Sequence, residues 1–336
     1  MVTATTTTTT TAATTKEASS PAVAGTKIGI VGVGGWGKNH ARVLAELGYL
    51  AAVCDSDSAR ASEVASRHGA KPYTSLDAML AAERLDGCLV CTPTKTHAAV
   101  AKKVMERGVH TFVEKPLAFS SQECEEMMQA AKKSRVILTA GYIERFNPAV
   151  SETKRLIAEK KYGDLIMIEF HRENRMPLNI KDVGIIFDTS VHDIDTAMFL
   201  FDARPNVVFA RAGKRVHEHE DFATLMLGFP DQKVAIIASN WLTPKKVRTF
   251  SAVCTDGIVS GNFLTQELKI DQAGESITPR RDFQEPLTLE LKNFVQSVQG
   301  KASPVVSAAD ATNVTRVAEA ALLSSNTGSP IYLDLK

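Results

Sequence analysis

The sequence predicts an α/β protein with two domains: an N-terminal doubly wound Rossmann domain and a C-terminal α+β domain with a large, open-faced, mainly antiparallel sheet. Three observations support this fold class. Strand-like and helix-like segments alternate from Lys27 to about Gly141, and the first strand runs into a glycine-rich turn. Beyond Asn147, several strand-like runs follow one another without helices. At 336 residues, the chain is also too long for one ordinary hydrophobic core.

Composition excludes several classes of partner. The chain is 44% hydrophobic and 23% charged, as ordinary globular proteins are, and its net charge of +1 gives no field to attract nucleic acid or acidic membranes. No run approaches the roughly 18 apolar residues of a membrane span. Five scattered cysteines favour a reduced, cytoplasmic protein. Residues 1–25 are rich in Thr, Ala and Ser, so we expect a disordered tail and no secretory signal.

The N-terminal domain is expected over residues 26–146. Its first unit is the strand KIGIV from Lys27, followed by the glycine turn and the helix KNHARVLAELG, which ends at Gly48. The second unit joins the strand YLAAVCD to the helix SARASEVASRHG. The alternation continues through SLDAMLAAE (helix), DGCLVCTP (strand), THAAVAKKVMERG (helix) and VHTFVEKP (strand). This order predicts a parallel sheet with crossover helices.

The C-terminal domain is expected over residues 147–336. It begins with helix-like PAVSETKRLIAEKK and later contains the helix-like segment DTSVHDIDTAMFLF. Its strand-like runs are LIMIEFHRE, NVVFARAG, ATLMLGF, KVAIIASNWL, RTFSAVCT and GIVSGNF. The closing segments, LTLELKNFVQSVQG and AADATNVTRVAEAALLSSNTG, have the pattern of amphipathic helices that could pack back on the first domain.

The glycine-rich turn has the spacing GxGxxG and consists of Gly32, Val33, Gly34, Gly35, Trp36 and Gly37. It follows a predicted strand and opens a predicted helix, as the dinucleotide-binding fingerprint requires. Gly32 would permit the tight turn, Gly34 the close approach of a pyrophosphate and Gly37 close helix packing. The alternative is a structural glycine turn without a ligand.

Asp55 ends the next strand, about 20 residues after the turn, where the fingerprint expects an acid. Its carboxylate can accept hydrogen bonds from both ribose hydroxyls of adenosine, and it would repel the extra phosphate of NADP. The arginine that usually binds this phosphate is missing, since Ser56, Asp57 and Ser58 follow. NAD is therefore the predicted cofactor, although an acid in an exposed turn is also common.

Glu114, Lys115 and Pro116 lie at the carboxyl end of a predicted parallel strand, the edge where such sheets bind ligands. The ammonium of Lys115 could hydrogen-bond a substrate hydroxyl and stabilise the alkoxide that precedes hydride loss, while Pro116 fixes the backbone. The alternative is an ordinary surface lysine at a strand end.

Asp188, His192 and Asp195 recur at i, i+4 and i+7, which predicts that one helical face presents all three. Alcohol oxidation needs a base, and an imidazole oriented by a nearby carboxylate suits that role at neutral pH. His192 is therefore the candidate base, and a satisfied core histidine is the alternative. These residues could also bind a metal in principle, but nicotinamide chemistry does not need one.

Two further patterns suggest metal or redox chemistry only weakly. Cys88 and Cys91 form a CxxC without a second ligand pair nearby. The run His217-Glu218-His219-Glu220 is typical of a solvated loop between strands. We therefore predict no metal site.

The motifs GVGGWG, EKP and GxxxDxxxH together resemble the Gfo/Idh/MocA oxidoreductase family over nearly everything after Lys27. The resemblance implies that Thr92, Pro93 and His97 line the nicotinamide pocket beside Glu114. It also implies that Lys115, Asp188 and His192 are the catalytic residues, and that the peptide bond between Lys115 and Pro116 is cis.

Within the family, GYIERFNPAV, DVGIIFDTSVHDID and SNWLTPKKVRTFSAV are most similar to the enzymes that oxidise the C3 hydroxyl of UDP-N-acetylglucosamine. The similarity implies that the substrate is a small-molecule sugar nucleotide. It further implies that Glu144, Arg145 and Asn147 reach the sugar. Cationic residues would neutralise the diphosphate, as guanidinium groups do well; the candidates are Arg172, Arg175 and Lys181.

Two alternatives to this function stay open from the sequence. One is a dehydrogenase of another substrate, such as inositol, glucose or UDP-N-acetylglucosaminuronate. The other is a catalytically silent regulator that binds the dinucleotide. In either case, an open sheet with apolar strands such as KVAIIASNWL would be costly to leave in water, so we expect a homodimer or homotetramer.

Overall fold

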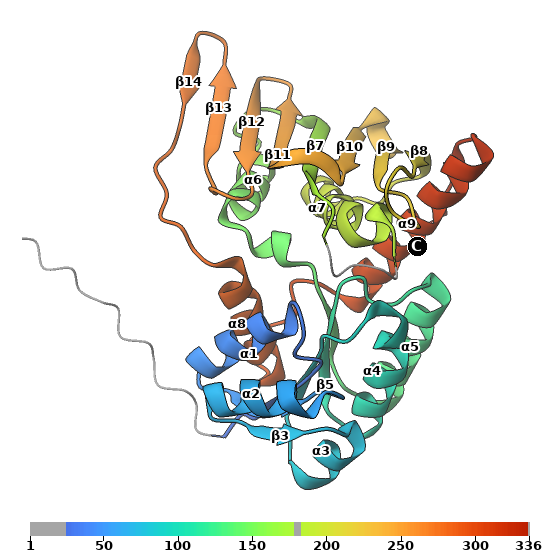
Figure 1. The fold of residues 1–336 in the computed structure, drawn as a ribbon. Helices are drawn as coiled ribbons and strands as arrows, with labels where there is room; N and C mark the ends of the chain where they lie inside the picture. Colours follow the sequence, from blue (N-terminus) through green and yellow to red (C-terminus); the bar gives the residue numbers. More distant parts are fainter. Residues whose placement is uncertain (1–24, 178–182, 335–336) are drawn as a thin grey trace, which may run out of the picture.

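The computed structural model describes residues 25–177 and 183–334. Nearly all of the expected Thr-rich tail, and Lys181, lie outside these residues. The described chain forms two sheets, one in each half of the sequence (Figure 1). None of the described helices is long and apolar enough to cross a bilayer.

The N-terminal sheet is a six-stranded Rossmann sheet in the order β3-β2-β1-β4-β5-β6, and all of its neighbouring strands are parallel. Its strands are β1 (Ile28–Val31), β2 (Leu50–Cys54), β3 (Lys71–Tyr73), β4 (Gly87–Val90), β5 (His110–Glu114) and β6 (Leu138–Gly141). The helices between them are α1 (Gly37–Glu46), α2 (Ser58–His68), α3 (Leu76–Ala82), α4 (His97–Glu106) and α5 (Ser121–Ser134). Apolar residues of α1 and α2 pack in one core cluster, and those of α3 and α4 pack in others, so helices cover both faces. The predicted doubly wound fold is confirmed.

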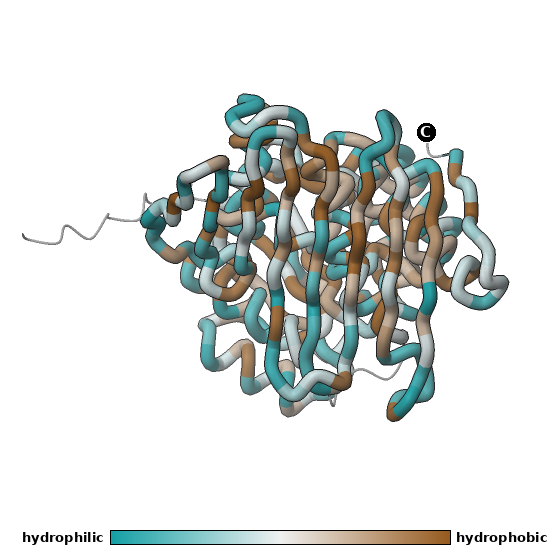
Figure 2. Tube along the Cα trace, turned by 90° about the horizontal axis from the view of Figure 1, so that it is seen from above, coloured by the Kyte–Doolittle hydropathy of each residue, from teal (hydrophilic) through white to brown (hydrophobic). Residues whose placement is uncertain are grey.

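The C-terminal sheet has nine strands in the order β14-β13-β12-β11-β7-β10-β9-β8-β15. They are β7 (Leu165–Arg175), β8 (Val207–Gly213), β9 (Phe222–Gly228), β10 (Val234–Asn240), β11 (Leu242–Cys254), β12 (Gly257–Asn262), β13 (Leu268–Gln272), β14 (Glu275–Ile277) and β15 (Ile331–Tyr332). Only the pairing of β7 with β10 is parallel within this described sheet. Figure 2 shows the outer face of the sheet with no helix over it. The predicted open-faced, mainly antiparallel sheet is also confirmed.

Helices cover the inner face of the large sheet. They are α6 (Pro148–Ala158), the π-helical turn η3 (Ile186–Ser190), α7 (Val191–Phe201) and α9 (Ala308–Thr327). Between β6 and α6 lies a short 3-10 turn, η2 (Ile143–Phe146). Inward-facing strand residues such as Ile168 and Phe170 pack against these helices in one core. Helix α7 therefore lies between the large sheet and the N-terminal domain (Figure 1).

The closing helices join the two halves. Helix α8 (Pro286–Val298) packs beside α1, and its Phe294 meets Phe112 of β5 edge-on with ring centroids 5.6 Å apart. Just before α9, the carbonyl of Val306 accepts a 2.7 Å hydrogen bond from Thr139 of β6. Glu319 of α9 accepts from both the backbone and the hydroxyl of Ser121. These contacts fix the carboxyl edge of the Rossmann sheet relative to α7.

Candidate active site

The glycine turn shows which glycines the fold needs and which one leaves space. Gly32 has φ of +85°, and a Cβ there would lie 2.6 Å from the carbonyl oxygen of Cys91. A Cβ on Gly37 would lie 2.0 Å from the carbonyl oxygen of Gly32, so α1 can approach β1 only with glycine there. A Cβ on Gly34 would meet only Arg60, at 3.9 Å. The space at Gly34, before the α1 N-terminus, fits a pyrophosphate.

Asp55 follows β2 and borders this space with a buried carboxylate that is 6% exposed. One oxygen accepts a 2.9 Å hydrogen bond from the amide of Val33, and the other accepts from the amide of Asp57 and from Arg60, both at 3.0 Å. The adjoining hollow of about 730 Å³ is lined in part by Gly34, Gly35 and Arg60. Trp36 is half exposed beside it. Arg60 was not predicted from the sequence, because it lies in α2 and not directly after the strand.

The predicted nicotinamide-pocket residues follow β4. Thr92 and Pro93 precede the short turn η1 (Thr94–Thr96), and His97 begins α4. His97 is only 1% exposed, and its ring nitrogens lie 2.9 Å from the carbonyl of Pro116 and 2.8 Å from that of Thr92. Burial lowers its pKa. Both ring nitrogens face backbone carbonyls, so His97 lies between the two loops, and its role in the nicotinamide pocket stays a prediction.

Glu114 ends β5 with its carboxylate already occupied. One oxygen lies 2.6 Å from Nε2 of His40, a fully buried residue of α1, and the other accepts from the backbone amide of Lys115 at 3.0 Å. Burial alone would raise the pKa of Glu114, but the hydrogen bond and charge of His40 and the charge of Lys115 lower it overall. His40 was missed from the sequence because its partner lies 74 positions away.

Lys115 joins the two domains. The peptide bond from Lys115 to Pro116 is cis, as the resemblance implied. The ammonium donates to the backbone oxygen of Asp188 at 2.6 Å and to its carboxylate at 2.8 Å. Both side chains keep some exposure, 17% for Lys115 and 18% for Asp188. The end of β5 and the turn η3 therefore meet at a partly open ion pair.

His192 lies in the first turn of α7, four residues after Asp188. Its ring is partly exposed, and the buried Nδ1 has no hydrogen-bond partner among the described residues. Burial lowers its pKa well below the usual value, and the positive charges of Lys115, Arg172 and Arg248 lower it further. The imidazole is therefore neutral. No carboxylate of the described residues orients it, which differs from the expectation, because Asp188 instead accepts hydrogen bonds from Lys115 and from the hydroxyl of Thr189.

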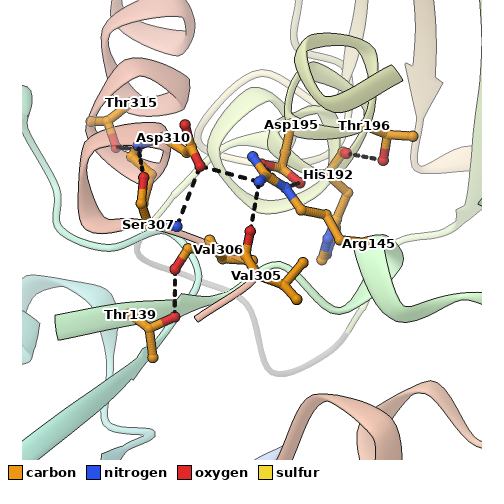
Figure 3. Close-up of polar contacts among 11 residues, drawn as sticks. Thr139, Arg145, His192, Asp195, Thr196, Val305, Val306, Ser307, Asp310 and Thr315 are labelled. Carbon is orange, nitrogen blue, oxygen red and sulfur yellow. Dashed lines mark hydrogen bonds and ion pairs between the residues drawn. The ribbon is translucent and has the colours of Figure 1, made fainter. Parts of the chain in front are cut away.

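Arg145 and Asp195 form a separate buried pair (Figure 3). The guanidinium of Arg145 donates to Asp195 at 2.7 to 3.1 Å, and also to the carbonyl of Val305 and the carboxylate of Asp310. Asp195 is fully buried and its carboxylate binds Arg145, so it does not orient His192. Arg145 is 6% exposed, and its ion pairs hold η2 against α7 and the start of α9. The described contacts of its guanidinium therefore give Arg145 a structural role, and its predicted contact with the sugar is not supported by them.

Arg172 and its partners form a second buried network. Arg172 is 1% exposed and donates to Asp193 at 2.8 to 3.1 Å and to Glu144 at 3.0 Å. Asn147, also 1% exposed, donates to Glu144 and to the carbonyl of Phe263. Direct contact of Arg172, Glu144 and Asn147 with substrate is therefore not what the geometry supports, because their hydrogen-bonding groups are occupied inside the fold.

Arg175 alone of the predicted diphosphate-binding residues is both described and exposed. It ends β7, and its side chain has no ion pair with a described residue. Around the whole site, no three His, Cys, Asp or Glu residues within 25–177 and 183–334 are arranged to hold a metal ion. Cys88 and Cys91 are free thiols, and burial raises the pKa of both.

Two family signatures match this architecture. Residues 26–142 match the oxidoreductase family with an NAD-binding Rossmann fold, GFO_IDH_MocA, and residues 150–260 match the GFO/IDH/MocA C-terminal domain. The chain belongs to the Gfo/Idh/MocA family. Its N-terminal domain is thus an NAD-binding domain, in agreement with the predicted cofactor and with the open space at the glycine turn.

Several members of the Gfo/Idh/MocA family are similar over most of the chain. The UDP-N-acetylglucosamine 3-dehydrogenase of Acidithiobacillus ferrooxidans is 30% identical over 75% of this chain and 79% of its own length. A solved structure of that enzyme superposes with a TM-score of 0.83, covering 90% of this chain and 98% of that one at 26% identity. The scyllo-inositol 2-dehydrogenase (NAD(+)) of Bacillus subtilis is 30% identical over 91% of this chain and 96% of its own length. These relatives support an NAD-dependent sugar or polyol dehydrogenase.

Proposed function

We propose that this Gfo/Idh/MocA protein is an NAD-dependent dehydrogenase that oxidises the C3 hydroxyl of UDP-N-acetylglucosamine to the 3-keto sugar nucleotide. The observation that supports the chemistry is the partly open pair of Lys115 and Asp188 beside the neutral imidazole of His192. The choice of substrate rests on similarity to the Acidithiobacillus enzyme, which matches in sequence and in structure.

The proposed reaction divides the work between two side chains. NAD, when bound at the glycine turn and Asp55, supplies the hydride acceptor. The neutral His192 takes the hydroxyl proton, which needs a lone pair that a protonated ring would lack. Lys115 hydrogen-bonds the same oxygen and stabilises its developing negative charge. The oxygen then forms the carbonyl with the carbon that loses the hydride.

Asp188 prepares Lys115 for this role. An ammonium has three N–H donors, and Asp188 receives two of them, at its backbone oxygen and its carboxylate. The third donor remains for a substrate oxygen. Both side chains of the pair keep some exposure, so the amino group of Lys115 is not buried away from the substrate. Asp188 is therefore a positioning residue in this mechanism.

A substrate panel tests the proposal. Purified protein with NAD is offered UDP-N-acetylglucosamine, UDP-N-acetylglucosaminuronate, glucose and inositol, and NADH formation is followed by absorbance. The highest kcat/KM is expected for UDP-N-acetylglucosamine, with a product whose ketone NMR assigns to C3. Good turnover of inositol or glucose and none of the sugar nucleotide would disprove the substrate assignment and leave the reaction class intact.

Inositol oxidation is the second candidate, because the Bacillus relative matches a larger share of both chains than the Acidithiobacillus enzyme does. A catalytically silent regulator is less well supported. A pure dinucleotide-binding protein has no need of a neutral imidazole beside a lysine that keeps a free donor. Turnover of any panel substrate excludes the regulator.

Self-association through the outer face of the large sheet is part of the proposal. Apolar side chains are half exposed on that face, including Met226 of β9 and Ile258 of β12. Covering them with a second copy would remove this area from water. We expect a homodimer or homotetramer, and light scattering of the purified protein distinguishes either from a monomer.

A further inference from the structure

Two arginines face each other across neighbouring strands of the large sheet. Arg172 of β7 pairs directly with Arg248 of β11 in the antiparallel register. Directly opposed residues point to the same side of a sheet, and like charges in such positions repel. Arg172 bonds Asp193 of α7, so both side chains lie on the inner face, toward the helices. If both arginines had only a structural role, we would expect each of them to have an acidic partner within the fold.

Only Arg172 is compensated. It has two carboxylate partners, whereas the guanidinium of Arg248 makes no hydrogen bond or ion pair with any described residue. Its Nε is buried without a partner. The acids close enough to affect it are Glu144, Asp193 and Asp188, and each is already paired with Arg172 or Lys115. Arg248 is thus a partly buried cation with unused donors.

Arg248 lies near the candidate catalytic residues. The charge of Arg248 contributes to the lowered pKa of His192, together with Lys115 and Arg172. Lys246, two residues earlier on β11, is exposed, and the charge of Arg248 lowers its pKa. Arg248 and Lys246, neither of which has an ion pair in the described part of the chain, therefore lie two residues apart on one strand beside the site. Leaving a guanidinium unpaired in a partly desolvated position costs free energy unless a ligand anion completes it.

We propose that Arg248, assisted by Lys246, is the binding site for the diphosphate of the sugar nucleotide. This inference rests on the proposed function and names the residues that select an anionic substrate. The planar fork of a guanidinium matches two phosphate oxygens at once, and the lysine adds a second positive charge at the exposed end. A neutral polyol would leave both cations unpaired. Arg172, which the sequence suggested for this role, instead has its donors occupied by Asp193 and Glu144.

The test measures binding of UDP, which has the diphosphate but no sugar to oxidise. Calorimetry on the NADH-loaded protein compares wild type with Arg248→Gln, Arg248→Lys and the control Arg84→Gln, which removes an exposed arginine of the N-terminal domain. We expect Arg248→Gln to weaken UDP binding about tenfold to a hundredfold, Arg248→Lys to weaken it less, and Arg84→Gln to leave it unchanged. NADH affinity should stay the same in all four proteins.

Failure of this inference differs from failure of the proposed function. Equal UDP affinity in wild type and Arg248→Gln, or no UDP binding by wild type, would overturn the diphosphate site. UDP binding that depends on Arg248, without oxidation of UDP-N-acetylglucosamine, would keep the site and reject the sugar. Should Arg248→Gln unfold, Arg248→Lys keeps the charge and removes the fork, and wild-type UDP affinity in that variant would also contradict the proposal. For UDP-N-acetylglucosamine, the loss at Arg248 should appear in KM far more than in kcat.

Discussion

Polar residues of the segment formed by η3 and α7 fall into two groups, which differ in burial and in how completely their hydrogen-bonding groups are occupied. Asp193 and Asp195 are fully buried, and each binds an arginine through several hydrogen bonds. Asp188 and His192, on the same segment, stay partly exposed. The candidate catalytic residues therefore differ from the structural ones in that Lys115 and His192 keep unused hydrogen-bonding groups. Charge or burial alone does not make this distinction.

The largest effect on stability should come from breaking one of these buried ion pairs. Arg145→Met leaves Asp195 buried without its cation, so the free energy of unfolding should fall by about 3–5 kcal/mol. Chemical denaturation measures this change. Arg155→Met is the matched control, because Arg155 of α6 forms exposed ion pairs and its loss should leave stability nearly unchanged. Equal losses in both variants would show that burial of the Arg145 pair is not important for stability.

Lys115 and His192, which keep unused hydrogen-bonding groups, should affect turnover and leave stability largely alone. Lys115→Ala removes the donor to the reacting oxygen, so kcat should fall about a hundredfold to a thousandfold. Steady-state NADH formation gives kcat, and fluorescence titration gives NADH affinity, which we expect to change little. A normal kcat in Lys115→Ala would remove this residue from the mechanism.

A smaller effect, on the preference for NAD over NADP, is expected at Asp55. Asp55→Asn withdraws the negative charge that opposes the extra phosphate of NADP and removes one of the two ion pairs of Arg60. The preference for NAD over NADP should narrow by roughly tenfold or more. The ratio of kcat/KM for the two cofactors measures it. An unchanged ratio would mean that Asp55 does not select the cofactor.

The smallest effect concerns the pH dependence of kcat/KM. His192 can accept a proton only when it is neutral. Its pKa lies well below the ordinary 6.5, so kcat/KM should fall only where the pH approaches this lowered pKa. Arg248→Gln removes a nearby positive charge that opposes protonation of His192. The pKa of His192 should then rise, and the acid limb should move to higher pH. A limb that stays in place, or moves lower, contradicts the assignment of His192 as the base.

Local patterns predicted much of the fold and of the cofactor site. The alternation of strands and helices, the glycine spacing and Asp55 each depend on residues close together in the chain. Helix α5 was not predicted, because its buried face consists only of Cys124, Met127 and Ala131. The short strands β3 and β14 were not predicted either, since neither has a buried residue to mark it.

The roles of the arginines could not be predicted from the sequence. Arg145 and Asp195 are 50 positions apart, and Arg172 and Glu144 are 28 apart, so the fold alone determines which charges are paired. The π-helical turn at Ile186–Ser190 also departs from the regular helix that the i, i+4, i+7 spacing assumed. Arg248 was missed for the same reason, because its lack of a partner is visible only in three dimensions.

The most direct test of the central claim compares Asp188→Asn with Asp193→Asn. Both replacements are isosteric, both remove an acid paired with a cation, and the two positions are five residues apart in one segment. Turnover and unfolding are measured on each protein with the best substrate of the panel. We predict that Asp188→Asn lowers kcat at least tenfold with little loss of stability. Asp193→Asn should lose about 3–5 kcal/mol of stability while its folded fraction keeps turnover near wild type. If both variants lost stability and turnover to the same extent, the division between a structural acid and an acid that positions Lys115 would be contradicted.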